Sequence, residues 1–322
     1  MTTPHARVTA FAPGSIGNLG PGLDVLGAAV TGPGDQVDAT WVDADGIVVL
    51  DPGHPELPSD ATRHASALAA AAVVRIAGSL GAPMPAPGIA LRVTKGLALA
   101  AGQGGSASSA VAGAAAVNAL LGSPLDRTAL LLACLSAEEV VAGRHLDNIA
   151  PSLLGGVVIV RSLDPIDVVS LPVPERLRVV LAHPAQRLRT QDARAVLPSD
   201  IARSVAVHQL AQVATIVAAL HSGDLALLGR AIDDRIAEPA RAPLLPGFIP
   251  AKRAALAAGA LGASISGAGP TAFALCDGDQ SAAAVADAMR AAYAAEDIEA
   301  SVRVARIDTE GVRIDHHPVE RP

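Results

Sequence analysis

The sequence is poor in aromatic side chains and in lysine. Its 322 residues include three Phe, one Trp and one Tyr, and its only lysines are Lys95 and Lys252. The formal net charge is −7. Binding of DNA or RNA needs cationic surfaces that neutralise phosphates or rings that stack on bases, and an acidic chain with so few rings suits neither. We therefore expect no nucleic-acid partner.

Cysteine is also almost absent. Cys134 and Cys276 lie in apolar surroundings and no C-x-x-C pattern occurs, which argues against a disulfide framework. Buried free thiols, and residues 1–7 without an apolar leader segment, indicate a cytoplasmic location. The uncharged stretch 96–123 is interrupted by glycines and polar side chains, whereas a spanning helix needs about 20 mainly apolar residues. We expect no membrane association.

Helical and strand-like patterns are mixed along the chain without regular βαβ alternation, which favours an α+β fold. A proline-containing loop at 162–176 is the candidate boundary between two domains, residues 1–165 and 166–322. The expected strands are 6–12, two runs forming a hairpin within 36–50, 88–95, 156–161, 177–183, 263–265, 271–276 and 301–307. The expected helices are 62–79, 106–121, 126–143, 201–222, 224–238, 249–259 and 280–294. Since large rings are scarce, the core must depend on closely packed helices.

The most informative segment is KGLALAAGQGGSASS, which starts at Lys95 and leads into an Ala-rich helical pattern. Its glycines let backbone N–H groups turn toward one point, and the start of a helix adds the positive end of a dipole. Such a loop holds a polyphosphate, although the Walker pattern G-x-x-x-x-G-K-[ST] is absent. The residues expected to bind the nucleotide are Lys95, Gly102, Gln103, Gly104, Gly105, Ser106, Ala107 and Ser108.

Two other segments, PGSIGNLGPGLD at 13–24 and GASISGAGPT at 262–271, complete a resemblance. Together with the glycine loop they resemble, in order and spacing, the three motifs of the GHMP kinases. This resemblance implies a two-domain α+β fold, with a ribosomal-protein-S5-like N-terminal domain and a ferredoxin-like C-terminal domain, and it implies ATP and Mg²⁺. The loop departs from the family's second motif at Ala98, Ala100, Gln103 and Gly105.

Within that group, three segments look like those of the homoserine kinase family. They are HLDNIAPSLLGG at 145–156, TQDARAVLP at 190–198 and DRIAEPAR at 234–241. The resemblance implies transfer of the ATP γ-phosphoryl group to the side-chain hydroxyl of L-homoserine, and it suggests a homodimer. Two alternatives stay open: a GHMP kinase for a different small alcohol, and a non-catalytic nucleotide-binding regulator on the same fold.

The resemblance also assigns the metal. Ser106, at the helix start, and Glu138 would supply hard oxygens to Mg²⁺. Glu139 is an alternative to Glu138, and an ordinary helix N-cap is the structural alternative for Ser106. For Lys95, contact with a phosphate and a plain exposed position at the end of a strand are equally compatible with the sequence.

For the acceptor, Arg194 and Arg241 look like a clamp on the amino-acid carboxylate, a geometry that suits guanidinium groups. Asp147 and Asn148 would lie at the acceptor hydroxyl, and Asp147 could act as a base if it faces the substrate. Surface salt bridges and turn chemistry are the structural alternatives for these residue types. The remaining substrate-binding candidates are Asn18, Asp24, His145, Thr190 and Gly267.

Overall fold

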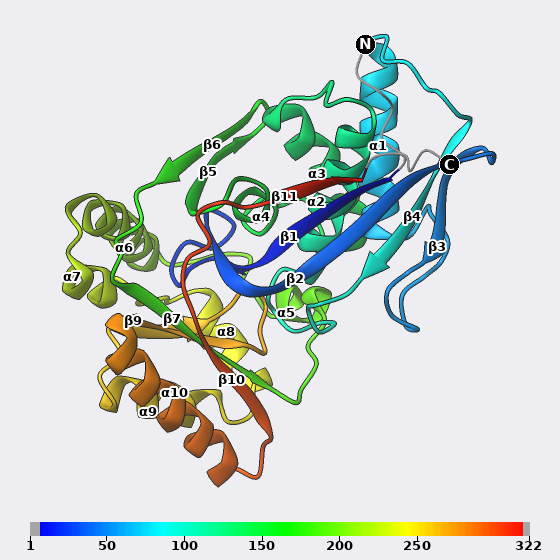
Figure 1. Ribbon diagram of the computed structural model, residues 1–322. Helices are drawn as coiled ribbons and strands as arrows, with labels where there is room; N and C mark the ends of the chain where they lie inside the picture. The colour runs from blue at the N-terminus through cyan, green and yellow to red at the C-terminus, as the bar shows by residue number, and fades with distance from the viewer. Residues whose placement is uncertain (1–6, 318–322) are drawn as a thin grey trace.

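The computed structural model describes residues 7–317, which form two β-sheets with helices packed on them (Figure 1). The strands are β1 (Arg7–Gly17), β2 (Leu26–Val42), β3 (Gly46–Asp51), β4 (Gly88–Thr94), β5 (Val157–Leu163), β6 (Ile166–Leu171), β7 (Leu177–Pro184), β8 (Gly262–Ile265), β9 (Ala272–Asp277), β10 (Ala300–Ala305) and β11 (Arg313–His317). The helices are α1 (Ala65–Ser79), α2 (Gly105–Leu120), α3 (Arg127–Val141), α4 (Ile149–Leu154), α5 (Thr190–Ala195), α6 (Arg203–Ser222), α7 (Leu225–Arg230), α8 (Ala237–Arg241), the 3₁₀ turn η1 (Ala242–Leu244), α9 (Phe248–Ala257) and α10 (Gly278–Ala295). Residues 1–6, part of the segment expected to lack a leader, lie outside the described range.

The first sheet runs in the order β11-β1-β2-β4-β3, and the β5–β6 pair joins it through β2. β1 and β2 pair antiparallel along nearly their whole length, with an irregularity between Pro13 and Gly14. β1 ends at Gly17, and the chain then turns through Asn18 and Leu19 with positive φ angles of 67° and 44°. The PGSIGNLGPGLD segment is therefore the end of a central strand and the turn after it.

Helices α1 to α4 pack on this sheet around a core made largely of Ala, Val and Leu. Helices α1 and α2 lie so close together that no space is left between them for large aromatic rings to fill. A Cβ on Gly113 of α2 would lie 2.5 Å from the carbonyl oxygen of Ser66 on α1, so only glycine allows this crossing. The expectation of a core built from closely packed helices is confirmed.

The second sheet has the order β10-β7-β9-β8, with all neighbours antiparallel. In chain order this is 4-1-3-2, with helices in the β7–β8 and β9–β10 connections, which is the ferredoxin-like arrangement. Side chains of β7 alternate between its two faces. Val180 and Ala182 contact the cluster under α9 and α10, whereas Val179 and Leu181 belong to a cluster shared with Leu26 of the first sheet. This shared cluster joins the two halves of the molecule.

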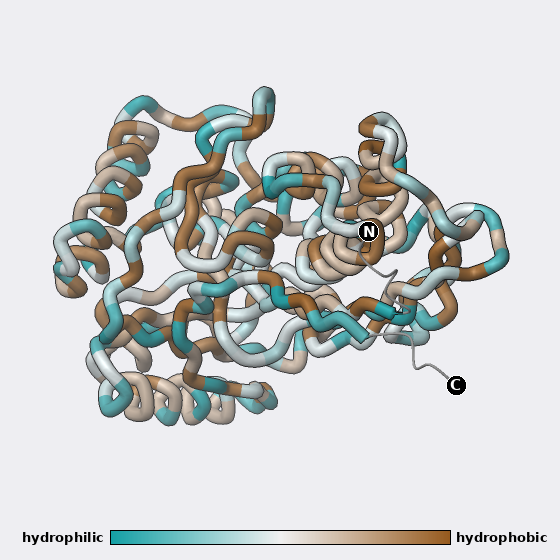
Figure 2. Tube along the Cα trace, turned by 45° about the horizontal axis from the view of Figure 1, so that its top comes forward, coloured by the Kyte–Doolittle hydropathy of each residue, from teal (hydrophilic) through white to brown (hydrophobic). Residues whose placement is uncertain are grey.

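The hydropathy of the chain differs between the loops and the packed elements. Figure 2 shows hydrophilic segments mainly in the peripheral loops, and hydrophobic segments along the strands and helices. The stretch 96–123, tested above as a membrane span, forms the glycine loop and the core helix α2. Among residues 7–317 one helix, α6, is long and apolar enough to cross a membrane by length and composition alone. Length and composition of a single helix carry no membrane assignment.

Several expected elements need correction. The runs at 36–50 do not form a hairpin, because β4 lies between them and pairs antiparallel with β2 and parallel with β3. The helix expected at 224–238 is interrupted, since α7 ends at Arg230 and α8 begins at Ala237. The first ten residues of β2, together with α4, α5, β6 and β11, were not expected, and β6 lies within the stretch 162–176 that was expected to be a loop. Cys134 and Cys276 are buried and free, as expected.

The expected domain boundary falls at the turn between β5 and β6. Both of these strands, and β11 from the end of the described chain, belong to the first sheet. If the chain is divided by strand pairing, the boundary between the two units lies after Leu171 rather than after residue 165. Residues 313–317, which form β11, then belong to the first unit. We keep the division into two units as a proposal in this revised form.

Candidate functional site

The three motifs and the three additional segments meet at one cavity of about 730 Å³. Its wall contains the glycine loop, the C-terminal part of α3, the segment before α4, and residues of α5, α8 and the β8–β9 turn. The predicted site residues that line it are Asn18, Lys95, Gly102, Gly104, Gly105, Ser106, Glu138, His145, Asp147, Asn148, Thr190, Arg194, Arg241 and Gly267. Segments up to 249 positions apart in the sequence thus contribute to one site, since Asn18 donates to the carbonyl of Gly267.

The glycine loop needs glycine at two positions. Gly102 and Gly104 have φ angles of 72° and 69°, in the left-handed region that favours glycine. A Cβ on Gly104 would lie 2.1 Å from Ser15 Oγ, and one on Gly102 would lie 2.5 Å from the carbonyl oxygen of Gly269. The loop is thus packed against both other motifs. It delivers the first turn of α2 to the cavity, where the first N–H groups of a helix have no intrahelical acceptor.

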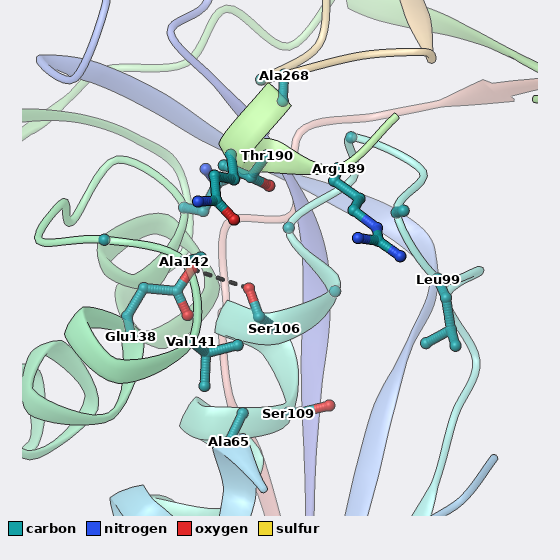
Figure 3. Close-up of a pocket in the computed structure, with 18 of the residues that line it drawn as sticks. Ala65, Leu99, Ser106, Ser109, Glu138, Val141, Ala142, Arg189, Thr190 and Ala268 are labelled. Atoms are coloured by element: carbon teal, nitrogen blue, oxygen red, sulfur yellow. Dashed lines mark hydrogen bonds between the residues drawn. The ribbon is translucent and has the colours of Figure 1, made fainter. Parts of the chain in front are cut away.

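Ser106 and Glu138 form the metal-binding candidate. Figure 3 shows them pointing toward each other from the first turn of α2 and from α3, and Ser106 Oγ donates to Glu138 Oε1 over 2.8 Å. Glu138 is buried, and its Oε2 has no hydrogen-bond partner. Burial raises the pKa of the Glu138 carboxyl, although His145 and Ser106 act in the opposite direction. Glu139 also borders the cavity, but its side chain is 59% exposed and lies near Arg144.

Two hard oxygens, one of them buried and unpartnered, fit Mg²⁺. Magnesium in phosphoryl-transfer sites takes one or two protein ligands and completes its shell with phosphates and water. Consistent with this, no cluster of three or more His, Cys, Asp or Glu side chains able to hold a metal occurs within residues 7–317. The geometry favours Glu138 over Glu139 for this role.

Two arginines also line the cavity. Arg194 on α5 donates to both carboxylate oxygens of Asp24, over 2.6 and 3.2 Å, and its buried Nε has no partner. Arg241 is buried, and it donates to the carbonyl oxygens of Ala193 and Gly267. Burial and the neighbouring charge of Arg194 lower the pKa of Arg241. Arg194 forms an ion pair with one carboxylate, and Arg241 donates only to carbonyl oxygens, so the two guanidinium groups have capacity for a further anion.

Asp147 and His145 are buried polar groups with unused hydrogen-bonding capacity. Asp147 Oδ2 accepts from the backbone N–H of Asn18 over 3.1 Å, but its Oδ1 has no hydrogen-bond partner. His145 Nδ1 lies 3.6 Å from Asp147 Oδ1, and neither ring nitrogen of His145 makes a hydrogen bond. Burial raises the pKa of the Asp147 carboxyl. Such orphaned groups in a cavity wall point to a ligand.

The ligand-free protein should lose stability with rising pH because of Asp147. A carboxyl whose pKa is higher in the folded state binds more protons when folded, so its contribution falls as pH rises from about 4 through the raised pKa. Asp147→Asn removes this titration and keeps an acceptor for Asn18. In EDTA, we expect the melting temperature of the variant relative to the parent to increase between pH 5 and pH 8. A constant difference across that range would contradict the assignment.

Asn18 and Asn148 are mainly engaged within the protein. The Asn18 amide donates to Gly267 and accepts from the N–H of Asp24 over 3.2 Å, so it connects the first and third motifs. Asn148 Oδ1 accepts from Ser15 Oγ over 2.9 Å. A Cβ on Gly17 would lie 2.5 Å from both Asn148 Nδ2 and Asp147 Oδ2, so glycine lets this strand approach them.

Three of the predicted nucleotide-binding residues do not line the cavity, and a fourth, Lys95, lines it but is engaged within the protein. Ala107 and Ser108 are buried beneath the loop, and Ser108 Oγ donates to the carbonyl of Ala12. Gln103 turns toward the second half of the molecule, where it contacts Thr271 and Arg303. The Lys95 ammonium group forms hydrogen bonds within the protein, to Asp35, the carbonyl of Gly105 and Ser109. The positions of these residues follow from long-range packing, which the motif pattern does not encode.

Some residues of the cavity were not predicted. Arg63, His64 and Arg189 line it, and Figure 3 places Arg189 beside Thr190 at its rim. Arg63 and His64 lie in none of the motif segments, so no local pattern identified them. Arg189 directly precedes the TQDARAVLP segment, but no motif includes it.

Comparison with known proteins agrees with this geometry. The model of the GHMP kinases N terminal domain matches residues 65–156, and that of the GHMP kinases C terminal domain matches 216–295. The homoserine kinase of Chloroherpeton thalassium is 37% identical over 96% of this chain and 99% of its own length. That of Arabidopsis thaliana is 38% identical, over 95% of this chain and 84% of its own.

Solved structures lead to the same family. The crystal structure of homoserine kinase from Cytophaga hutchinsonii has a TM-score of 0.91 at 40% identity, covering 98% of this chain and 99% of that one. Mevalonate kinase from L. major, at 17% identity, shares the fold with a TM-score of 0.68. The α+β fold with GHMP N- and C-terminal domains is therefore confirmed. This chain belongs to the homoserine kinase family of the GHMP kinases.

Proposed function

We propose that this protein transfers the γ-phosphoryl group of ATP to the side-chain hydroxyl of L-homoserine, giving O-phospho-L-homoserine and ADP. One observation carries the proposal. A single cavity is lined both by the N-terminus of the long helix α2 and by two buried or half-buried arginines, Arg194 and Arg241. The first suits a polyphosphate and the second suits the carboxylate of an amino acid.

The nucleotide end is assigned to the glycine loop. Backbone N–H groups of Gly104, Gly105 and Ser106 would bind the phosphates, with the helix dipole adding to their field. Ser106 and Glu138 would hold Mg²⁺, which when bound neutralises charge on the phosphate oxygens. Gly102 supports the turn. Gln103, Ala107, Ser108 and Lys95 are assigned to the structure of the loop, as their contacts indicate.

The acceptor end is assigned to Arg194, Arg241 and Asp24. The arginines would bind the homoserine carboxylate, and Asp24 would exchange part of its pairing with Arg194 for the substrate ammonium. Thr190 and His145 line the same part of the cavity and would add hydrogen bonds. Asn18 and Gly267 would shape this wall through their mutual hydrogen bond.

In the transfer, the acceptor hydroxyl oxygen attacks the γ-phosphorus, the bond to the β–γ bridging oxygen breaks, and ADP leaves. The hydroxyl proton must leave as well. We assign this proton to Asp147, because its Oδ1 has no hydrogen-bond partner, whereas the neutral amide of Asn148 can only orient the hydroxyl. Most of the catalysis is then positioning and charge stabilisation.

The proposal is tested by coupled detection of ADP with a panel of acceptors. We expect Mg²⁺-dependent ADP release with L-homoserine, much less with L-serine, and none above background with mevalonate or galactose. Transfer to an alcohol without an amino-acid group would favour another GHMP kinase. ATP binding by calorimetry without turnover on any acceptor would favour a regulator. The homodimer and the cytoplasmic location remain predictions, to be checked by light scattering and cell fractionation.

A further inference from the structure

A buried ion pair lies directly under the glycine loop. Asp35 is on β2 and is fully buried, and Lys95 follows β4, with a side chain only 6% exposed. The two residues pair although they are 60 positions apart. Asp35 lies outside the three motifs, Lys95 is the first residue of the glycine-loop segment, and neither is among the residues proposed above to touch a substrate.

Besides pairing with each other, the two side chains form hydrogen bonds with the glycine loop and with the first turns of α2. Asp35 Oδ1 accepts from the N–H groups of Gly96 and Leu97, over 3.1 and 3.2 Å, where the loop begins. Its Oδ2 accepts from Ser109 Oγ over 2.6 Å, in the first turns of α2. The three protons of the Lys95 ammonium meet Asp35, Ser109 Oγ at 3.0 Å and the carbonyl of Gly105 at 3.1 Å.

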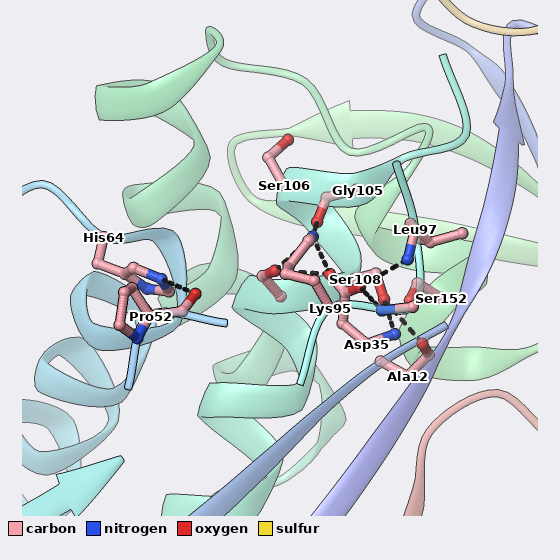
Figure 4. A network of polar contacts seen from close by, with 12 residues as sticks. Ala12, Asp35, Pro52, His64, Lys95, Leu97, Gly105, Ser106, Ser108 and Ser152 are labelled. Carbon is pink, nitrogen blue, oxygen red and sulfur yellow. Dashed lines mark hydrogen bonds and ion pairs between the residues drawn. The ribbon is translucent and has the colours of Figure 1, made fainter. Parts of the chain in front are cut away.

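Figure 4 shows this convergence, with Lys95 and Asp35 between Leu97 on one side and Gly105 on the other. The Asp35 N–H also donates to Ser108 Oγ, which in turn donates to Ala12 on β1. The beginning and the end of the loop are therefore fastened to the sheet at a single point.

One of these contacts sets the direction of an N–H group. The peptide unit between Gly105 and Ser106 is planar, and in a trans peptide the C=O and N–H bonds point in opposite directions. Lys95 donates to the carbonyl of Gly105, the first residue of α2. The N–H of Ser106 consequently points the other way, toward the cavity that Ser106 lines.

Stability alone does not explain the pair. Removing two charges from water is costly, and an apolar pair of similar volume is often as stable or more stable. The geometry points to a different role. We infer that Asp35 and Lys95 are positioning residues that hold the loop, and the Ser106 N–H and hydroxyl, in the orientation that binds the phosphates of ATP. This inference rests on the proposed function, because it assumes that the loop binds ATP.

The test is a double-mutant cycle with Asp35→Asn, Lys95→Met and the double variant, using Mg·ATP binding by calorimetry. If the pair acts as a unit, each single variant and the double variant should weaken Mg·ATP binding by about 30-fold, without additivity. KM for homoserine should change less than about threefold, because the arginine side of the cavity is untouched. Lys252→Met, which breaks the ion pair of the chain's other lysine with Glu238, is the matched control and should leave ATP binding unchanged.

The double variant keeps the test decisive if a single variant fails to fold, because it leaves no buried charge unpaired. Mg·ATP binding by the folded double variant within threefold of the parent would overturn the inference. So would tight binding by Asp35→Asn together with weak binding by Lys95→Met, since Lys95 would then be a direct phosphate ligand. Failure of the proposed function has a different signature: the parent protein would bind ATP without phosphorylating homoserine, and the cycle could still be measured.

Discussion

Replacement of Arg194 by alanine should raise KM for homoserine by roughly 100-fold while KM for ATP changes little. Arg194 is the half-buried arginine whose Nη atoms both contact Asp24 and whose Nε has no partner. A charge-assisted, bidentate contact with the substrate carboxylate is worth about 3 kcal/mol, and alanine cannot replace it. The variant also leaves Asp24 without its cation, which adds repulsion toward the same carboxylate.

The measurement is steady-state kinetics with each substrate varied in turn. Arg290→Ala is a suitable control, because Arg290 is an exposed arginine that pairs with Asp287 on α10, away from the cavity. It should behave like the parent protein. If Arg194→Ala raised both KM values equally, or neither, the assignment of Arg194 to the acceptor would be wrong.

Replacement of Glu138 by glutamine should lower kcat by about 10³-fold and weaken Mg·ATP binding. The change keeps the size of the side chain and an acceptor for Ser106 Oγ, but it removes the negative charge from the buried Oε2. The cost then falls on charge stabilisation during transfer rather than on folding. KM for homoserine should stay within a few fold of the parent value, because Arg194 and Arg241 are unchanged.

Glu139→Gln is the matched control one position away. Glu139 is mostly exposed and lies near Arg144, so its loss should leave kcat nearly unchanged. A larger loss of kcat in Glu139→Gln than in Glu138→Gln would transfer the metal-binding role to Glu139. Titration of activity with Mg²⁺ in both variants separates metal affinity from turnover.

The sequence was sufficient to locate the site because its chemistry resides in short contiguous segments. The glycine loop, the HLDNIAPSLLGG segment and the TQDARAVLP segment each have a pattern of their own, and all three contribute to one cavity. The start of α2 at Gly105 was predicted within one residue, since glycines followed by an Ala-rich run mark a helix start clearly.

What the sequence did not reveal are contacts between distant segments. Lys95 was assigned to the nucleotide because it precedes the loop, but its partner Asp35 lies on a part of β2 that was not predicted as a strand. Gln103 occupies a motif position, yet its partners Thr271 and Arg303 lie on the other half of the molecule. Local patterns cannot encode such pairings, which depend on the packing of two sheets.

Sheet order was hidden for the same reason. The runs around 36–50 have the length and turn of a hairpin, and only the insertion of β4 between β2 and β3 changes their pairing. β11 joins β1 from the other end of the chain, with Arg7 opposite His317. A strand that pairs about 300 positions away has no local signal that identifies its partner.

The central claim is that one cavity binds a triphosphate at the start of α2 and an amino acid at the two arginines. A crystal structure with a non-hydrolysable ATP analogue, Mg²⁺ and L-homoserine tests it directly. We expect the phosphates within hydrogen-bond distance of the N–H groups of Gly104 to Ser106, the metal on Ser106 and Glu138, and the homoserine carboxylate on Arg194 and Arg241. Phosphates bound away from those N–H groups, or homoserine bound without contact to either arginine, would contradict the account.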